Sequence, residues 1–204
     1  MTRHTTPDDK KLCAHHEAAH AVVATVRGIT VRYTTIRPRI PGYAGVTVLR
    51  HPKKDGPWQD YAAVLAAGAV TDDIFTGIRT RPTLAVRHEQ GDFDMLRLAA
   101  RQVRQETRAK RPPNGVEVPR TASVRAIAAI GWREAHRTVV SHYGAVLAVA
   151  DGLLSRATLT GAEVRALITG ASQVDPDRAD QALEFWPSWF MKNWWVPEGQ
   201  ASRV

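Results

Sequence analysis

The sequence predicts a mainly helical fold with a small β hairpin or ribbon. Segments bounded by helix start and stop signals cover most of the chain, and only residues 29–49 are rich in strand-forming residues. With 204 residues, 44% of them hydrophobic, the chain can bury a core of its own. We therefore expect one domain over residues 1–175, followed by an aromatic-rich C-terminal tail over residues 176–204.

The first helix has clear signals at both ends. Thr6 can cap it, Pro7 suits the first helical position, and acidic residues at 8 and 9 favour the positive end of the helix dipole. Small and apolar residues then recur with helical spacing until Gly28, a typical stop signal. The sequence thus predicts a helix over residues 7–27.

The next elements are two strands and a series of helices. Strand-like residues at 29–36 and 43–49 flank a turn at 38–42, which indicates a hairpin or ribbon. Thr160 and Glu163 have the spacing of a capping box and predict the start of the last helix. The expected later helices span residues 58–75, 92–110, 122–155 (split near Gly131 or Gly144) and 160–170.

Composition sets limits on location and on partners. The formal charge of +8 and the isoelectric point near 10.1 favour acidic partners without identifying any of them. One cysteine, Cys13, rules out an intramolecular disulfide framework and fits a reducing compartment. The first residues lack the apolar core of a signal peptide, and no apolar run is long enough to span a bilayer. We therefore expect a cytoplasmic protein.

The segment His-Glu-Ala-Ala-His, residues 16–20, has the spacing of a metal site on the first predicted helix. His16 and His20 would lie about 40° apart in helical projection, so both imidazoles can reach one ion. Glu17, about 100° from His16, can point to the open side of that ion and accept a proton from water there. Two imidazoles and one carboxylate suit Zn²⁺ and leave a fourth position open. The pattern predicts a zinc site with Glu17 as the catalytic base.

Spacing alone leaves the third metal ligand open. The position six residues after His20 is Val26, and no glutamate occurs between Glu17 and Glu89. Cys13 lies three residues before His16, and we expect a buried helix residue there rather than a ligand. The remaining acidic candidates are Asp60, Asp72, Asp73, Glu89, Asp92 and Asp94.

Several segments, taken in order, resemble the peptidase domain of the FtsH family of ATP-dependent zinc metallopeptidases. Residues 16–24, HEAAHAVVA, are similar to the family's HEAGHALVA, and residues 65–77 are similar to its lgGRaAEelvfG segment. The other similar segments are 34–39 with 42–45, 91–95, and 145–168. The resemblance covers residues 12–170 and implies a helical peptidase domain.

The resemblance also implies roles for individual residues. His16 and His20 would be metal ligands, Glu17 the catalytic base and Asp94 the third ligand, at the predicted start of a helix. The interval from Gly91 to Asp94 is one residue shorter than in the family pattern, so Asp92 remains a second candidate. The family's Arg and Glu pair is replaced by Ala69 and Asp72, and Asp72 could hold a ligand histidine.

The sequence lacks the ATPase module that accompanies the peptidase domain in this family. It contains no Gly-Lys pair and therefore no phosphate-binding loop of the family's type. We expect a zinc endopeptidase that uses no ATP itself. It would either cleave unfolded or flexible polypeptides alone or receive its substrates from another protein, and a homo-oligomer is compatible with this function.

Two other functions are compatible with the sequence. One is a catalytically silent, zinc-containing adaptor that binds partners through the Trp-rich tail, which we expect to pack on the domain or on a second subunit. Peripheral membrane contact and a lid over the substrate are the alternatives for this tail. The other function is nucleic-acid association, although the basic helix face is more typical of a solvated surface. That face consists of Arg97, Arg101, Arg104, Arg108, Lys110 and Arg111.

Overall fold

The computed structural model describes residues 7–37, 44–50, 56–76, 90–109 and 114–171. Several sequence expectations therefore lie outside the described residues. They concern the Thr6 cap, the turn at 38–42, Lys110 and Arg111 of the basic helix face and the aromatic tail at 176–204. The division into a domain and a tail stays a prediction.

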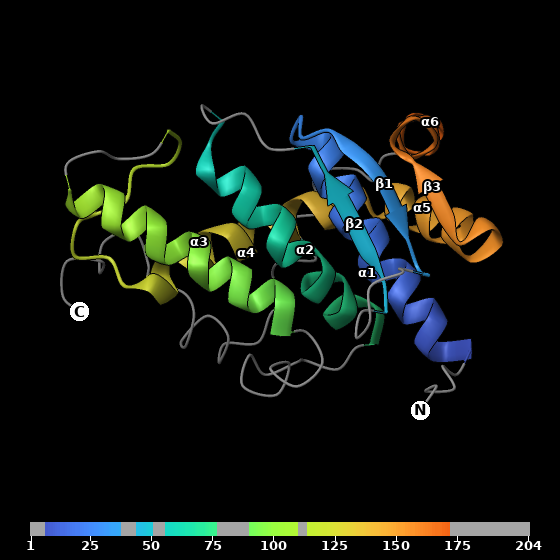
Figure 1. Ribbon diagram of the computed structural model, residues 1–204, viewed down its shortest axis with the longest axis horizontal. Coiled ribbons are helices and arrows are strands. Elements are labelled where there is room, and N and C mark those ends of the chain that lie inside the picture. Colours follow the sequence, from blue (N-terminus) through green and yellow to red (C-terminus); the bar gives the residue numbers. More distant parts are fainter. Residues whose placement is uncertain (1–6, 38–43, 51–55, 77–89, 110–113, 172–204) are drawn as a thin grey trace.

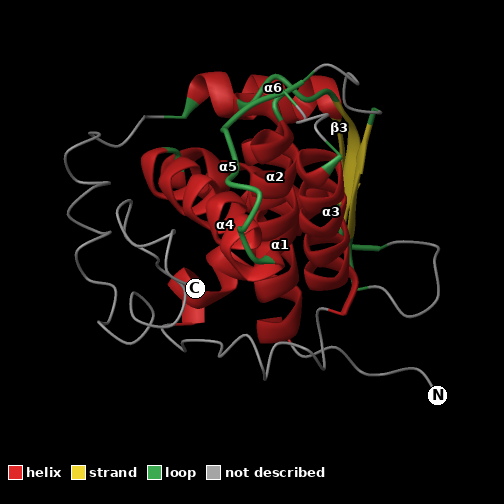
Figure 2. Cartoon of the chain, turned by 90° about the vertical axis from the view of Figure 1, so that its left-hand side faces the viewer, coloured by secondary structure: helices red, strands yellow, loops and turns green. Residues whose placement is uncertain are grey.

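The described part of the chain is mainly helical, which confirms the predicted fold class. Figure 2 shows a bundle of helices with a small sheet along one side. The helices are α1 (Pro7–Val26), α2 (Trp58–Thr76), α3 (Gln90–Arg108), α4 (Val124–Ser141), α5 (Tyr143–Arg156) and α6 (Gly161–Gly170). Each of them lies within a few residues of its predicted range.

Small side chains allow the central helices to pack closely. Ala14, Ala18 and Ala21 of α1 are fully buried, and α2 contributes a similar series of buried alanines. At Gly131 of α4, an added Cβ atom would lie 2.6 Å from Cβ of Ala62, so α2 and α4 touch at backbone distance. This close packing gives α1 and α2 fixed positions relative to each other, and both carry residues of the site described below.

The sheet has three strands rather than the two of the expected hairpin. β1 (Val31–Thr35) lies between β2 (Val46–Leu49) and β3 (Thr158–Thr160), and both pairings are antiparallel. The third strand, only three residues long, joins α5 to α6 and is too short for an alternating pattern to be read from the sequence. Figure 1 shows the sheet in front of α1.

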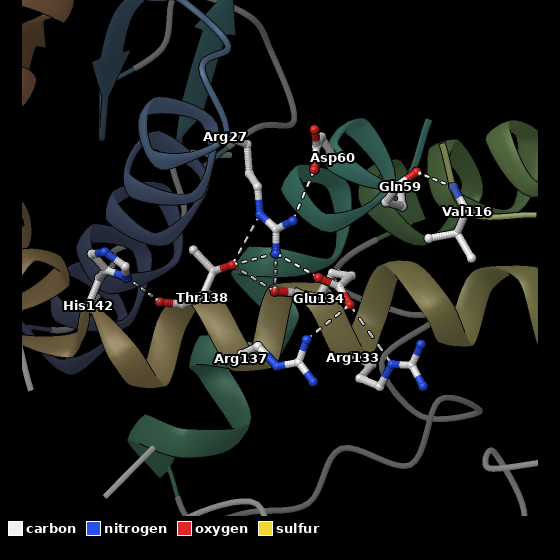
Figure 3. Close-up of polar contacts among 9 residues, drawn as sticks. All are labelled: Arg27, Gln59, Asp60, Val116, Arg133, Glu134, Arg137, Thr138 and His142. Atoms are coloured by element: carbon white, nitrogen blue, oxygen red, sulfur yellow. Dashed lines mark hydrogen bonds and ion pairs between the residues drawn. The ribbon is translucent and has the colours of Figure 1, made fainter. Parts of the chain in front are cut away.

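A partly buried ionic cluster holds the end of α1. Arg27 donates hydrogen bonds to Asp60 Oδ1 of α2 at 3.0 Å and to Glu134 Oε2 of α4 at 2.9 Å. It also donates to Thr138 Oγ1 at 2.9 Å, as Figure 3 shows. Gly28, with φ of 73°, then turns the chain out of the helix. We refer to Arg27, Asp60, Glu134 and Thr138 as the Arg27 cluster.

The later helices follow their sequence signals. The long helical region breaks at His142, next to Gly144, which was one of the two predicted positions. The capping box of α6 is complete, because Glu163 N donates to Thr160 Oγ1 while Thr160 N donates to Glu163 Oε2. On α3, the arginines at 97, 101 and 108 are exposed and Arg104 is partly buried.

No single helix of the described chain is both long and apolar enough to cross a membrane. α4 and α5 satisfy these criteria only when taken as a pair, and this pair is bent by 81°.

Candidate metal centre

Three side chains from two helices meet beside α2. His16 and His20 lie one turn apart on α1, and Asp92 comes from the first turn of α3. Asp92 Oδ2 lies 3.0 Å from Nε2 of each histidine, and the two Nε2 atoms are 3.2 Å apart. The predicted pairing of the two histidines is therefore present, and an acidic residue completes a group that can hold a metal ion.

The spacing of these three atoms fits a small divalent ion. An ion with bonds of about 2.0–2.1 Å to tetrahedral ligands separates the ligand atoms by about 3.3–3.4 Å. The observed separations of 3.0 and 3.2 Å are close to this value. Two imidazole nitrogens and one carboxylate oxygen are also a donor set that zinc accepts, with a further position left for water.

The other ring nitrogens of the histidines are already engaged. His20 Nδ1 donates to the carbonyl oxygen of Val64 at 2.6 Å, and His16 Nδ1 lies 2.8 Å from Asp72 Oδ2. A carbonyl oxygen can only accept, and a carboxylate does the same, so Nδ1 of each ring carries the proton. In the neutral rings both Nε2 atoms are then free to bind a metal.

Asp72 of α2 holds His16 in place from behind. It is 9% exposed and accepts the hydrogen bond from His16 Nδ1, which fixes both the tautomer and the plane of the ring. Such carboxylate–histidine pairs are common around metal sites and raise the basicity of the ligand. This contact agrees with the prediction from the sequence that Asp72 could hold a ligand histidine.

Acidic neighbours dominate the electrostatics of both imidazoles. Burial disfavours the charged form of His16, but Asp72 and Asp92 outweigh it and hold the pKa of His16 well above 6.5. Burial also opposes the charge on His20, yet Asp92 raises the pKa of this ring as well. The pKa of Asp92 is lowered because the two histidines overcome the effect of its burial. The group therefore attracts positive charge, whether as protons or as a metal ion.

Glu17 lies next to this group and is 6% exposed. Its Oε2 atom accepts a hydrogen bond of 2.8 Å from Thr47 Oγ1 of β2. Burial raises the pKa of Glu17 above 4.5, although the two histidines and the bond from Thr47 partly offset it. A carboxylate with a raised pKa is better suited to take up and return a proton near neutral pH.

Two glycines allow these side chains to approach the backbone. An added Cβ atom at Gly68 of α2 would lie 2.3 Å from Nε2 of His16 and 2.6 Å from Nε2 of His20. At Gly45, just before β2, it would lie 2.5 Å from Cγ of Glu17. Neither position can accept a side chain without displacing the candidate ligands or the candidate base.

The structure places Asp92, and not Asp94, at the histidine pair. Asp94 is exposed on α3 and contributes no atom to the group. Positions two apart on a helix differ by about 200° in direction, so only one of the two carboxylates can face α1. Of the two alternatives that the sequence left open, the geometry therefore selects Asp92 in place of the expected Asp94.

The remaining acidic candidates lie elsewhere or have other tasks. Asp60 belongs to the Arg27 cluster, and Asp72 contacts His16 through Nδ1, away from the Nε2 atoms. Asp73 contributes no atom to the group, and Glu89 lies outside the described residues. Cys13 is half-buried, and burial, followed by the nearby Glu17, raises the pKa of its thiol to about 11. Cys13 contributes no atom to the group.

Some contributors to the site could not be identified from the sequence alone. Val64 takes part through its backbone carbonyl oxygen, for which a sequence carries no signal. Thr47 resembles an ordinary strand residue, since threonine is common in strands. Gly68 interrupts an otherwise alanine-rich helix, which is the one local signal of close approach at this site.

The chain matches no protein-family model and no curated protein.

Proposed function

We propose that the protein is a zinc-dependent endopeptidase that works without ATP and has an FtsH-like arrangement of its site. The observation that carries this proposal is the convergence of His16, His20 and Asp92, with a buried glutamate at the next position of the same helix. A purely structural metal site would be expected to have four protein ligands. The described residues supply three, which leaves a position for a reacting molecule.

Each side chain would have a distinct task in peptide hydrolysis. His16, His20 and Asp92 would hold the zinc ion, and Asp72 with the Val64 carbonyl would orient the two rings. When bound, zinc supplies Lewis acidity, which polarises the scissile carbonyl and makes water more acidic. Glu17 would take a proton from the attacking water and deliver it to the leaving amine.

The position of β2 supports a polypeptide substrate. Within the described residues this strand pairs only with β1, and its Thr47 contacts Glu17. An extended peptide that pairs with the outer side of β2 would have its backbone near the candidate base. Such pairing requires an unfolded or flexible segment, in keeping with the substrate class expected from the sequence.

Replacing the candidate base tests this proposal. Glu17→Gln preserves size but cannot accept the proton, so we expect normal zinc content and loss of at least about 99% of casein cleavage without ATP. Glu117→Gln changes an exposed glutamate outside the site and serves as the matched control, with activity near that of the wild type.

Two outcomes would contradict the proposal. Cleavage by Glu17→Gln at the wild-type rate would exclude the mechanism. A wild-type chain that binds zinc and cleaves nothing would instead favour a catalytically silent adaptor.

A further inference from the structure

Strand β2 places the hydroxyl group of Thr47 next to the candidate base, Glu17. We propose that Thr47 is a positioning residue for the Glu17 carboxylate and that Thr34 holds Thr47 in place. This inference rests on the proposed function in one respect only, namely that Glu17 acts as the base. The contact between Thr47 and Glu17 can be tested whether or not the protein is an enzyme.

Thr47 Oγ1 stands at the centre of three short contacts. It lies 2.8 Å from Glu17 Oε2, 3.1 Å from the backbone oxygen of Glu17 and 2.8 Å from Thr34 Oγ1. Thr34 is fully buried, and Glu17 nearly so. Thr47 is half-buried, so two of the three polar groups are shielded from water, and the hydrogen bonds among them matter for the energy of the site.

The direction of these hydrogen bonds follows from the chemistry of the groups. An ionised carboxylate can only accept, so the single hydroxyl proton of Thr47 points to Glu17. Thr47 Oγ1 can then accept the proton of Thr34. This yields a one-way chain in which Thr34 donates to Thr47 and Thr47 donates to Glu17.

Strand pairing fixes the two hydroxyl groups in this arrangement. Thr34 is directly opposite Thr47 in the β1–β2 register and opposite Leu159 in the β1–β3 register. Strand β1 is thus paired on both sides, which keeps the hydroxyl group of Thr34 within hydrogen-bonding distance of Thr47. A glutamate has several rotatable bonds, so a fixed donor on one oxygen restricts the whole carboxylate.

The two oxygens of Glu17 have different surroundings. Oε2 receives the bond from Thr47, whereas Oε1 accepts no hydrogen bond from any described residue. An added Cβ at Gly45 would lie 2.6 Å from Oε1. Thr47 of the strand therefore holds one oxygen, and Gly45, just before the strand, places no side chain on the other. Oε1 is the atom available to exchange a proton with water.

Three threonine variants separate positioning from a merely structural role. Thr47→Val keeps the shape and the strand propensity but removes the donor, and Thr47→Ser keeps the donor. Thr158→Val is the matched control, because Thr158 forms an equivalent pair with Thr35 at 2.7 Å on the other side of β1.

We expect Thr47→Val to lower kcat for casein cleavage by about ten- to hundredfold, the effect of one hydrogen bond to a charged group. KM and zinc affinity should change by less than about twofold, since neither the ligands nor the outer side of β2 is altered. Thr47→Ser and Thr158→Val should keep kcat within about threefold of the wild type. An unchanged kcat in Thr47→Val, or an equal loss in Thr47→Ser, would overturn the proposal.

Unfolding in urea provides a readout that does not depend on activity. Thr47→Val, Glu17→Met and the double variant form a cycle, because methionine has no acceptor for the Thr47 hydroxyl, and the positioning contact predicts that their effects on the unfolding midpoint are not additive. Additive effects on the unfolding midpoint would show that Thr47 and Glu17 do not interact. If the wild type is inactive but the cycle shows coupling, the proposed function fails while the positioning of Glu17 by Thr47 stands.

Discussion

Two partly buried polar clusters share α1 and α2, and they differ in how their charges are balanced. The Arg27 cluster contains a permanent cation, Arg27, which faces the carboxylates of Asp60 and Glu134. The histidine cluster (His16, His20, Asp72 and Asp92) contains two carboxylates and two rings but no permanent cation. The first cluster has its own cation, whereas the second gains positive charge only from protons or a bound ion.

This difference indicates what each cluster does. Arg27 joins three helices and leaves no room for chemistry, because its donors are used by Asp60, Glu134 and Thr138. The histidine cluster brings three electron-rich atoms to within 3.2 Å of one another, which is unfavourable unless a positive charge joins them. Protons can supply this charge, and so can a metal ion. One cluster therefore acts as a structural clamp, and the other is a group that could hold a metal ion.

The largest expected effect comes from removing the carboxylate that completes the histidine cluster. Asp92→Asn should weaken zinc affinity by more than about a hundredfold, because even residues outside the ligand set contribute about ten- to hundredfold. Asp94→Asn, two positions away on the exposed face of α3, should leave affinity unchanged. Isothermal titration with zinc measures both. Equal affinities in the two variants would exclude Asp92 as a ligand, and a loss only in Asp94→Asn would restore the assignment implied by the family resemblance.

A smaller effect, on stability rather than on zinc, is expected at the other cluster. Arg27→Met keeps much of the side-chain volume but leaves Asp60 and Glu134 without their shared cation. Because these carboxylates are only partly exposed, the free energy of unfolding should fall by about 2 kcal/mol.

Urea unfolding of Arg27→Met measures this loss of stability. Zinc titration of the same variant should show an affinity within about twofold of the wild type. Arg137→Met is the matched control: its arginine is 55% exposed and lies 3.5 Å from the same Glu134, so its loss should cost less than about 1 kcal/mol. A loss of zinc binding in Arg27→Met without unfolding would show that the two clusters are not independent.

The sequence predicted the elements that carry strong local signals. Helix α1 was predicted from the residues at its ends, and the His16–His20 pair from helical spacing alone. The capping box at Thr160 and Glu163 marked the start of α6 within one residue. These features depend on neighbours in the sequence, so they can be recognised without knowledge of the fold.

Features set by contacts between distant segments were harder to predict. The choice between Asp92 and Asp94 depends on how α3 is rotated against α1, which no local pattern specifies. β3 contains three residues and becomes a strand only because β1 offers it a partner. Thr47 has the composition of any strand residue, and its importance appears only when β2 is placed beside Glu17.

The most direct test of the central claim is X-ray absorption spectroscopy of the zinc-loaded wild-type protein. We predict a single zinc per chain, with nitrogen and oxygen ligands at about 2.0–2.1 Å, scattering from two imidazole rings and no sulfur ligand. These are the signatures of His16, His20 and Asp92. A sulfur ligand at about 2.3 Å, or a shell of oxygen ligands without imidazole, would contradict the assignment of this site.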